Sequence, residues 1–321
     1  MKKIGILYGQ ENSFPPAFIE RVNQKAGGKD FVAEPVKIDK VIQGESAGYD
    51  VIIDRISQDV PFYRGWLKNE ALTGCAVVNN PFWWSADEKF FNNALATKID
   101  VAVPKTVLLP SHEIPADTSA GSFRNLAYPL DWEAIFAYIG WPAFFKPFAG
   151  GGWKNVYRLN NPEEFYRAYS ETGQLVMMLQ EEVKFDMYFR CYSIDQRNVR
   201  IMPYEPRNPY HLRYQTEWKT PRAILDKVEE GVLTLNQYLG YDLNTVEFAI
   251  RDGVPLAIDF CNPAPDAEVT SVGQANFDWV VEAVSDMAIR KAREHQPGQD
   301  NLSWGKFMQA AVTKRTLRDL A

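Results

Sequence analysis

The chain has 321 residues, enough for about two or three domains of roughly 100–200 residues, and 46% of them are hydrophobic, which is ample for sizeable cores. Its formal net charge of −6 argues against a nucleic acid or an anionic membrane surface as the main partner. No apolar run approaches the roughly 20 residues of a membrane span, and the N-terminal apolar stretch is too short for a signal peptide, so we expect a cytoplasmic protein. The three widely spaced cysteines, Cys75, Cys191 and Cys261, are expected to be reduced.

The first part of the chain alternates between short apolar runs and helical patterns. The predicted strands cover residues 2–9, 49–56 and 75–81, and the predicted helices cover 16–26 and 64–74. This alternation predicts a small parallel sheet with helices on its faces. A further helix is expected over 85–99. It begins with a capping box in which Ser85 is the N-cap and Glu88 is at N3, and Lys89 lies just inside it. The extended segment 101–111 is expected to end this unit.

The middle part follows a loop at 111–131 that is rich in Ser, Pro, Gly and Ala. Helices are predicted over 131–140 and 162–172, and strands over 154–159, 175–183 and a run that carries Lys146. Asn161 is the predicted N-cap of the second helix, and Pro162 is its first residue.

The last part is predicted to hold two pairs of strands and three helices. The strands cover 187–195, 198–206, 245–253 and 254–263, and the helices lie near 221–239, 276–296 and 302–319. Apolar residues recur at helical spacing in the helix at 276–296, so one of its faces is expected to cover a sheet. The whole pattern predicts an α/β protein with units at 1–110, 111–183 and 184–321.

The most informative segment is AFFKPFAGGGWKNVYRL (143–159), in which a lysine ends an apolar strand and three glycines follow it. Lys146 would supply a positive charge for a phosphate chain. Gly150, Gly151 and Gly152 would let the backbone approach the anion and direct N–H groups at it. The order of residues excludes a P-loop, in which lysine follows the glycines, and no dinucleotide-binding glycine pattern occurs here. The alternative is an ordinary hairpin turn with a surface lysine.

Oxygen-bearing side chains gather at one end of the last predicted strand pair. Glu247 lies on one strand, and Asp259 and Asn262 lie at the end of the next. Such oxygens suit Mg²⁺, which in nucleotide enzymes takes one or two carboxylates and fills its other positions with phosphate oxygens and water. The alternative is that these residues are solvated and without function. Their combination with the lysine and glycine segment favours a nucleotide–Mg²⁺ site.

A third candidate segment is Glu181, Glu182 and Val183, at the exit of the strand 175–183. Its backbone would offer alternating donors and acceptors with apolar flanks, which can bind an adenine edge. Any buried strand would present the same groups, so this segment alone does not identify a nucleotide site.

Together these motifs resemble the ATP-grasp superfamily, and within it the bacterial glutathione synthetases and ribosomal-protein glutamate ligases. The matching segments run in the same order over most of the chain: IDRISQDVPF (53–62), VVNNP (77–81), ADEKFFNNALA (86–96), VPKT (103–106), FKPFAGGGWKNVYRL (145–159), LQEEV (179–183), FRCYSID (189–195) and EFAIRDGVPLAIDFCNP (247–263). The resemblance implies a preliminary α/β domain at 1–110, a lid at 111–183 and a C-terminal domain at 184–321. In this fold the lid and the C-terminal domain clamp ATP between two antiparallel sheets.

The resemblance also implies roles in ATP binding. Lys89 and Lys146 look like the pair that contacts the phosphates and the adenine side of ATP. The loop 149–154 looks like a mobile flap over the phosphates, and the segment from Glu181 to Val183 looks like the adenine hinge.

Further roles concern phosphoryl transfer. Arg190 matches an arginine of the family that stabilises the transferring phosphoryl group or acyl phosphate, and a cross-strand salt bridge is the alternative for it. Glu247, Asp259 and Asn262 match the magnesium ligands. Arg55 falls where the glutathione synthetases keep an arginine after a short strand, and we expect it to face the substrate.

One departure from the family concerns the last motif, which is usually Glu-x-Asn and places both ligands on one strand face at i and i+2. Here Asp259-Phe260-Cys261-Asn262 puts the amide one residue later, so either a β-bulge restores the facing or one ligand moves. The shorter side chain of Asp259 leaves open whether one or two Mg²⁺ ions bind.

A second departure is the loop 202–218, which does not match the substrate-binding parts of glutathione synthetases, so glutathione is in doubt as the product. Within it, Tyr204, Arg207, His211 and Arg213 are expected to line the pocket for the amine or the carboxylate. The alternative is a solvated loop with a surface histidine.

The resemblance implies an ATP- and Mg²⁺-dependent ligase that joins a carboxylate to an amine through an acyl phosphate, acting on an amino acid or a small peptide. Two alternatives are an ATP-binding regulatory protein that has lost turnover and a phosphotransferase that uses the same clamp. The expected partners are small molecules, without nucleic acid or membrane, and homo-oligomerisation is left open.

Overall fold

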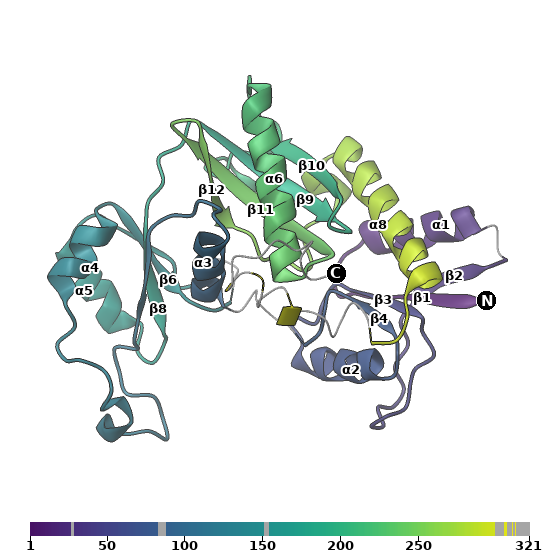
Figure 1. Cartoon of the computed structure of the whole chain (residues 1–321), viewed down its shortest axis with the longest axis horizontal. Helices are drawn as coiled ribbons and strands as arrows, with labels where there is room; N and C mark the ends of the chain where they lie inside the picture. Colours follow the sequence, from purple (N-terminus) through teal and green to yellow (C-terminus); the bar gives the residue numbers. More distant parts are fainter. Residues whose placement is uncertain are drawn as a thin grey trace. The chain divides into compact units, whose positions relative to one another are not determined.

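The computed structural model describes residues 1–26, 29–82, 88–150 and 154–298, together with residues 305, 306, 310 and 312. The chain folds into two compact units, one formed by Met1–Trp84 and Asp186–Ala321 and the other by Ser85–Phe185. Both units contain helices and strands, and the strands form three four-stranded sheets (Figure 1). This arrangement confirms the predicted α/β class. Within the described residues, no helix has the length and apolar character needed to cross a membrane.

The first unit contains the predicted parallel sheet, whose strand order is β2-β1-β3-β4. The strands are β1 (Lys2–Leu7), β2 (Phe31–Pro35), β3 (Val51–Asp54) and β4 (Ala76–Val78). All four residues of β3 are buried, as expected for a parallel strand that is covered on both faces. β2 is missing from the sequence-based expectations because its five residues are few and include Glu34 and Pro35, which do not favour strands.

Three helices cover the two faces of this sheet. They are α1 (Phe14–Ala26) and α8 (Gln274–Glu294) on one face and α2 (Pro61–Leu72) on the other. Alternation along the strands separates the two cores, since Ile53 packs with α1 and α8 whereas Ile52 packs with α2. α8 comes from near the C-terminal end of the described chain, so residues far apart in the sequence cover this face of the sheet.

The second sheet of this unit is antiparallel, with the order β10-β9-β11-β12. Its strands are β9 (Met187–Ile194), β10 (Asn198–Pro203), β11 (Leu243–Arg251) and β12 (Val254–Asp259). α6 (Arg222–Leu239) covers one face so closely that a Cβ atom on Gly231 would lie 2.8 Å from the ring of Phe248. On the other face, Tyr192 and Leu243 share one core with α8 and the parallel sheet. Two short helices complete the unit, η3 (Tyr210–Leu212) and α7 (Val269–Val272).

The second unit is built on an antiparallel sheet with the order β5-β8-β6-β7. Its strands are β5 (Thr106–Leu109), β6 (Ala143–Pro147), β7 (Tyr157–Leu159) and β8 (Met177–Glu181). Its helices are α3 (Lys89–Lys98), η2 (Ala120–Phe123), α4 (Trp132–Ile139) and α5 (Pro162–Glu171). α4 and α5 pack an aromatic core onto this sheet, with Phe145 and Phe165 completely buried at its centre.

Some element boundaries differ from the expectations. α5 begins as predicted, since the side chain of Asn161 accepts a hydrogen bond from the Glu164 amide. α3 begins only at Lys89, and Glu88 is its N-cap without a side-chain cap bond, so Glu88 is not at N3 as predicted; Ser85 lies outside the described residues. β5 does not end the first unit as expected but pairs with β8 in the second unit. The sequence did not indicate this pairing because β8 lies about 70 residues further along the chain. The three-part division at 1–110, 111–183 and 184–321 stays a prediction.

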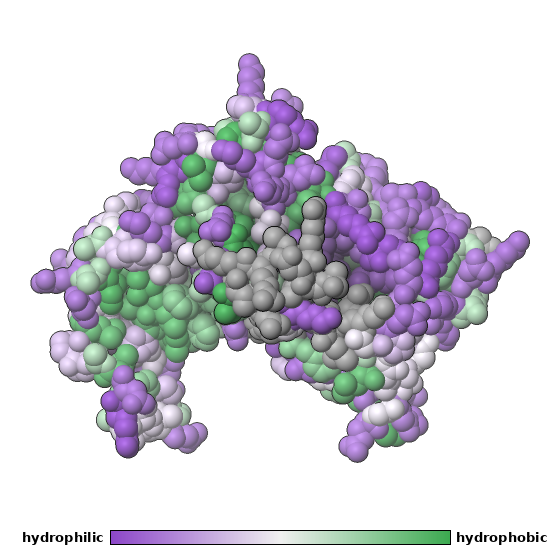
Figure 2. Space-filling view, in the orientation of Figure 1, coloured by the Kyte–Doolittle hydropathy of each residue, from purple (hydrophilic) through white to green (hydrophobic). Residues whose placement is uncertain are grey.

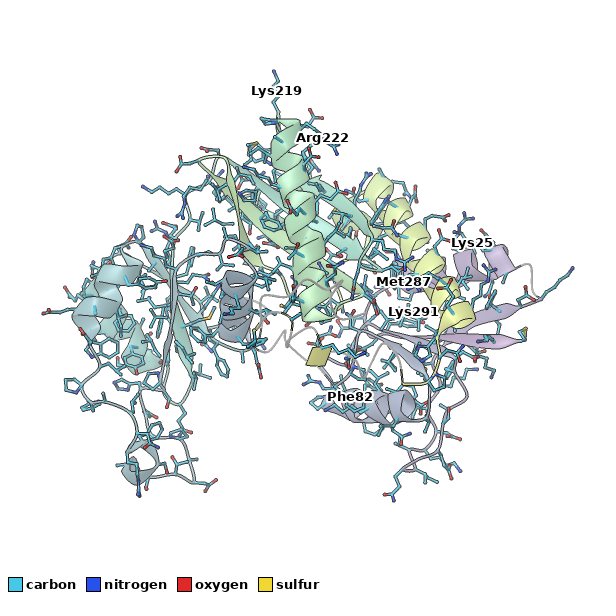
Figure 3. All side chains as sticks on the ribbon, viewed as in Figure 1. Lys25, Phe82, Lys219, Arg222, Met287 and Lys291 are labelled. Carbon is cyan, nitrogen blue, oxygen red and sulfur yellow. The ribbon has the colours of Figure 1, made fainter. Side chains whose placement is uncertain are left out.

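Asn79, directly after β4, joins the parallel sheet to the antiparallel one. Its side-chain oxygen accepts hydrogen bonds from the amides of Asp242 and Leu243, both at 2.9 Å. Its side-chain nitrogen donates to the carbonyls of Leu243 and Pro263 at 2.8 and 3.2 Å. Lys291 of α8, labelled in Figure 3, adds an ion pair to Asp242 at 2.9 Å. Because Asn79 is buried, these bonds replace its contacts with water.

We expect Asn79→Ala to lower the free energy of unfolding by about 2–4 kcal/mol, because it leaves buried backbone groups of three other residues without their partner. The matched control is Asn198→Ala, because Asn198 is exposed at the start of β10. This substitution should change the free energy of unfolding by less than about 0.5 kcal/mol. Urea unfolding of the full chain measures both. Equal stability of the two variants would contradict a structural role for Asn79.

A network of ion pairs joins α1 to α8. The carboxylate of Glu282 on α8 has one oxygen 2.5 Å from Nε of Arg21 and the other 2.6 Å from Nζ of Lys25. Lys25 also forms an ion pair with Asp286. Hydrogen bonds from Arg21 and then Lys25 lower the pKa of Glu282 to about 2. Figure 2 shows mostly hydrophilic residues over these two helices. The network therefore lies on the surface, where salt screens it.

This network predicts a pH dependence of stability. The folded pKa of Glu282 lies below the value of about 4.3 for an unfolded glutamate, so its contribution is complete above that value and is lost as pH falls toward about 2. The free energy of unfolding of the native chain and of Glu282→Gln can be measured by chemical unfolding between pH 6 and pH 2. The difference between the two free energies should be constant above about pH 5 and shrink below it. A difference that stays constant down to pH 2 would show that these pairs do not stabilise the fold.

Candidate functional site

The acidic residues of the predicted metal site lie opposite each other on neighbouring strands. Glu247 of β11 pairs with Asp259 at the end of β12, whereas the next residue, Phe248, pairs with Ala257. Ile258 is therefore an extra residue in β12, which makes a β-bulge just before Asp259. The bulge considered from the sequence would lie between Asp259 and Asn262, and it stays a prediction. The bulge at Ile258 puts the two carboxylate-bearing residues in register across the strands, where their side chains leave the same face of the sheet.

Glu247 is held in a largely buried position, with 16% of its side chain exposed. Its carboxylate accepts a hydrogen bond from the hydroxyl of Tyr188 at 2.6 Å. Burial raises the pKa of Glu247, Arg190 opposes this shift, and the charge of Asp259 reinforces it. Two neighbouring carboxylates repel each other when both are ionised, and a cation bound between them removes this repulsion.

Asn262 follows on the loop after β12. Its backbone amide donates to the side-chain oxygen of Asn244 at 2.7 Å, and its side-chain nitrogen donates to the carbonyl of Thr245 at 3.2 Å. This orientation commits the nitrogen of the amide to the backbone, and the side-chain oxygen accepts no hydrogen bond from the described residues. The oxygen is therefore the group of Asn262 that can bind a ligand.

These residues fit a magnesium ion that is shared with phosphate. Among the residues with described positions, no group of three or more His, Cys, Asp and Glu side chains could hold a metal ion. Glu247 and Asp259 could supply two carboxylates, and other ligands would have to come from an amide, water or a phosphate chain. Mg²⁺ in nucleotide enzymes is bound in this way.

Arg190 lies on β9 directly across from Glu247 of β11. Its Nε atom is 3.8 Å from Glu247 Oε1, an ion pair that is too long for a hydrogen bond. The cross-strand salt bridge considered from the sequence is thus present but loose. The guanidinium also lies over the ring of Tyr204, 5.7 Å from its centroid. Only 15% of the Arg190 side chain is exposed, so its charge acts in an environment with little water.

The loop 202–218 separates its four predicted substrate residues into two groups. Tyr204 is buried beside Arg190, and its hydroxyl accepts a hydrogen bond from Arg213 at 3.3 Å. In contrast, Arg207 and His211 are exposed, and Arg207 pairs with Glu205 at 2.6 Å. The structure thus brings Tyr204 and Arg213 to the site of Arg190, whereas Arg207 and His211 face solvent.

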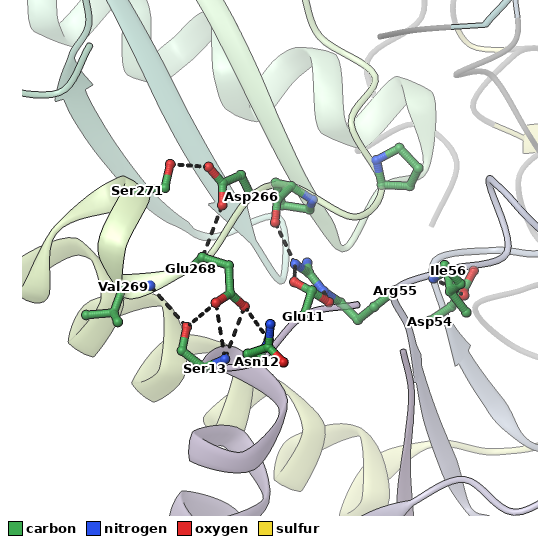
Figure 4. Close-up of polar contacts among 12 residues, drawn as sticks. Glu11, Asn12, Ser13, Asp54, Arg55, Ile56, Asp266, Glu268, Val269 and Ser271 are labelled. Carbon is green, nitrogen blue, oxygen red and sulfur yellow. Dashed lines mark hydrogen bonds and ion pairs between the residues drawn. The ribbon is translucent and has the colours of Figure 1, made fainter. Parts of the chain in front are cut away.

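Arg55, after β3, is enclosed by protein groups. Figure 4 shows its guanidinium against the carboxylate of Glu11. Its Nη2 atom also donates to the carbonyl of Pro265 at 2.6 Å. The guanidinium lies 4.9 Å from the centroid of the Phe14 ring, and only 1% of the Arg55 side chain is exposed. Glu11 and Pro265 thus use donors of Arg55 in this structure, and a contact of Arg55 with a substrate stays a prediction.

The loop after β12 makes polar contacts that the sequence did not indicate. Glu268 accepts hydrogen bonds from the amides of Asn12 and Ser13 at 2.9 and 3.1 Å, next to the N-terminus of α1 (Figure 4). Asp266 accepts from the hydroxyl of Tyr210 at 2.7 Å. Glu268 and its partners lie about 250 residues apart in the sequence, so no local pattern could have predicted these bonds.

In the second unit, the two predicted phosphate-binding lysines lie near one end of β6. The amide of Lys89, at the start of α3, donates to the carbonyl of Phe148 at 2.8 Å, two residues after Lys146. The ammonium group of Lys146 donates to the side chain of Gln180 at 2.9 Å, and Gln180 in turn donates to Thr106. Lys146 is thus held in a partly buried position by neighbouring strands.

The glycine segment is described only in part. Gly150 has a φ of +83°, a left-handed conformation that residues with a side chain rarely adopt, although a Cβ atom there would meet nothing within 4 Å. Glycine is therefore favoured at this position by the backbone conformation, and not by a steric clash that a side chain would cause. Gly151 and Gly152 lie outside the described residues.

The predicted adenine segment leaves β8 and passes into a loop. The amides of Glu181 and Glu182 donate to the carbonyls of Lys105 and Pro142. The side chain of Glu182 is paired with Arg158 by two hydrogen bonds at 2.7 and 2.8 Å. In contrast, the amide of Val183 has no hydrogen-bond acceptor within the part of the chain that is described. Val183 is therefore the residue of this segment whose N–H group is available to a ligand.

Comparisons with known proteins identify the fold. No protein-family model and no curated relative matches the chain. Among solved structures, the chain is similar to the RimK domain protein ATP-grasp from Sphaerobacter thermophilus, with a TM-score of 0.64, 15% identity, and 89% of this chain and 99% of that one covered. It is also similar to the D-alanine–D-alanine ligase from Bacillus anthracis complexed with ATP, with a TM-score of 0.63, 14% identity, and 91% and 98% covered.

A third similar structure is the ATP-grasp ligase PsnB complexed with precursor peptide PsnA2 and AMPPNP, with a TM-score of 0.56, 15% identity, and 90% of this chain and 97% of that one covered. All three comparisons extend over most of both chains, and the proteins share the fold that the motifs at 145–159 and 247–263 predicted. The chain therefore has the ATP-grasp fold.

Proposed function

We propose that the protein is an ATP- and Mg²⁺-dependent ligase that joins a carboxylate to an amine through an acyl phosphate. The observation that carries this proposal is the pairing of Glu247 with Asp259 by a β-bulge, directly beside the buried Arg190. Two carboxylates and one buried guanidinium on adjoining strands provide both a place for a metal–phosphate complex and a fixed positive charge next to it.

The chemistry explains why these residue types are needed. A substrate carboxylate would attack the γ-phosphorus of ATP, the bond to the β-phosphate oxygen would break, and ADP would leave. The amine would then attack the acyl carbon and release phosphate. The first step brings two anions together, so positive charge must offset their repulsion. We assign that task to Arg190 and Lys146. Mg²⁺, held by Glu247, Asp259 and the side-chain oxygen of Asn262, would supply further charge on the phosphate oxygens.

We assign ATP binding to residues of the second unit. Lys89 and Lys146 would contact phosphates, with Gly150, Gly151 and Gly152 forming the loop over them. The free N–H group of Val183 supports an adenine-binding role for the segment that also contains Glu181 and Glu182. No protein nucleophile is required, because the phosphoryl group passes directly to the substrate.

The substrate class is an amino acid or a small peptide. The similar PsnB structure contains a precursor peptide, which supports a peptide as one candidate. On the substrate side we place Tyr204 and Arg213, because they lie with Arg190. Arg207 and His211 remain predicted substrate residues that would contact a ligand only on the exposed side of the loop.

The direct test is the release of ADP and phosphate from Mg²⁺-ATP against a panel of amino acids and short peptides, singly and in pairs. A ligase should release ADP only with one carboxylate and one amine together. ATP binding without release would support a regulatory protein, and a stable phosphorylated product without an amine would support a phosphotransferase.

Lys146→Ala should reduce kcat/KM for ADP release by about 10²–10³-fold, because it removes a fixed positive charge from the phosphates. Lys98→Ala, at the exposed C-terminal end of α3, is the matched control and should leave the rate unchanged. Steady-state ADP release measures both variants. Full activity of Lys146→Ala would remove this lysine from the proposed site.

Glu247→Gln should raise the Mg²⁺ concentration needed for half-maximal ADP release by about tenfold or more, because one anionic ligand is lost. Glu230→Gln on the exposed side of α6 controls for the loss of one carboxylate elsewhere. Titration of activity with Mg²⁺ at saturating ATP measures the shift. An unchanged magnesium requirement would rule out Glu247 as a ligand.

A further inference from the structure

Arg190 has more hydrogen-bond donors than the described residues use. A guanidinium carries five N–H groups. Nη2 donates to the hydroxyl of Thr245 at a long 3.4 Å, the Nε atom is 3.8 Å from Glu247, and Nε has no hydrogen-bond partner within the described chain. A buried cation with unused donors is costly unless an anionic group completes it.

The hydroxyl of Tyr214 is a second unused donor in the same place. It is buried and, among the described residues, has no hydrogen-bond partner. Burial raises the pKa of Tyr214, and the positive charge of Arg190 only partly offsets this shift. The phenol is therefore protonated at neutral pH and can donate. A buried hydroxyl without an acceptor destabilises the folded state, so its presence calls for a reason.

Both donors lie against one aromatic ring. The guanidinium of Arg190 is 5.7 Å from the centroid of the Tyr204 ring, and the ring of Tyr214 is 5.0 Å from it in an edge-on arrangement. Tyr204 is fixed in turn, because its hydroxyl accepts a hydrogen bond from Arg213. A rigid ring thus holds a cationic donor and a neutral donor beside each other.

We propose that Tyr214 and Arg190 together bind the carboxylate of the substrate that is to be phosphorylated, an inference that rests on the proposed ligase function. Only an acceptor can satisfy two donors, and a carboxylate has two acceptor oxygens in one plane. Two positive charges, on Arg190 and Arg213, lie at this ring, whereas the carboxylates of Glu247 and Asp266 lie close enough to act on Arg190 and Tyr214. A carboxylate with one negative charge is therefore easier to accommodate than a phosphate with two.

The test measures binding of acetate to the full chain through its effect on Tm, against sodium chloride at the same ionic strength. Acetate should raise the Tm of the native protein. Tyr214→Phe should need an acetate concentration at least about tenfold higher for the same shift in Tm, because a hydrogen bond to a charged group is lost. Without acetate, Tyr214→Phe should be at least as stable as the native protein, since an unpartnered hydroxyl has been removed.

Tyr169→Phe is the matched control. The hydroxyl of Tyr169 in the second unit donates to the carbonyl of Pro110 at 2.9 Å, so this variant should be less stable without acetate but should respond to acetate like the native protein. A purely structural role for Tyr214 would give the same result as this control and would overturn the proposal. Stabilisation by inorganic phosphate but not acetate, lost in Tyr214→Phe, would also overturn it in favour of a phosphoryl subsite.

Kinetics separate this proposal from the proposed function. With a carboxylate substrate from the ADP-release panel, Tyr214→Phe should raise the KM for the carboxylate about tenfold or more and leave the KM for ATP unchanged. An unchanged KM for the carboxylate would refute the role of Tyr214 while the ligase function stands. Absence of ADP release by the native protein with every pair would refute the ligase function, and the acetate measurement would still decide whether Tyr214 binds a carboxylate.

Discussion

The burial of charge on two neighbouring strands is the constraint around which the first unit is organised. Arg190 and Glu247 are both largely removed from water, yet their ion pair is 3.8 Å long and leaves donors unused. Such a pair does not stabilise the fold by itself, because the loss of hydration exceeds what a loose contact returns. The surrounding sheet must therefore supply the stability. β9 and β11 are the two central strands of that sheet, and α6 and α8 cover its faces.

The loops near this sheet are fixed by bonds over long sequence distances. Asn79 joins the end of β4 to the start of β11, and Arg55 joins the loop after β3 to Pro265. Glu268 joins the loop after β12 to the loop before α1. Each bond ties a loop of the parallel sheet to residues beyond position 240. Loops held in this way lose little further freedom when a ligand binds, and a preorganised site benefits both binding and catalysis.

The second unit is held together mainly by an aromatic core, and its candidate groups are positioned more locally. Lys146 is bonded to Gln180 on the neighbouring strand, and the N–H group of Val183 is left available by the pattern of hydrogen bonds around it. In the first unit, donors and carboxylates are buried and incompletely paired. The two units thus offer different chemistry: a lysine and a backbone edge in one, and two carboxylates with a buried guanidinium in the other.

Sequence by itself determined the order and type of most elements, because the alternation of apolar residues and the cap at Asn161 are local properties. It also indicated Lys146, Glu247 and Asp259, whose chemistry is evident from residue type and position at strand ends. It could not determine the partner of β5, the enclosure of Arg55, or the bulge at Ile258, which depend on strands that meet only in the folded chain.

The role inferred for Tyr214 likewise depends on tertiary structure. The sequence shows a tyrosine in a polar loop, and nothing in its neighbours marks it as important. Only the folded chain places its hydroxyl out of water, against Tyr204 and near Arg190, without an acceptor among the described residues. Residue types and periodicity are written locally in a sequence, whereas burial and the pairing of polar groups are properties of contacts between distant segments.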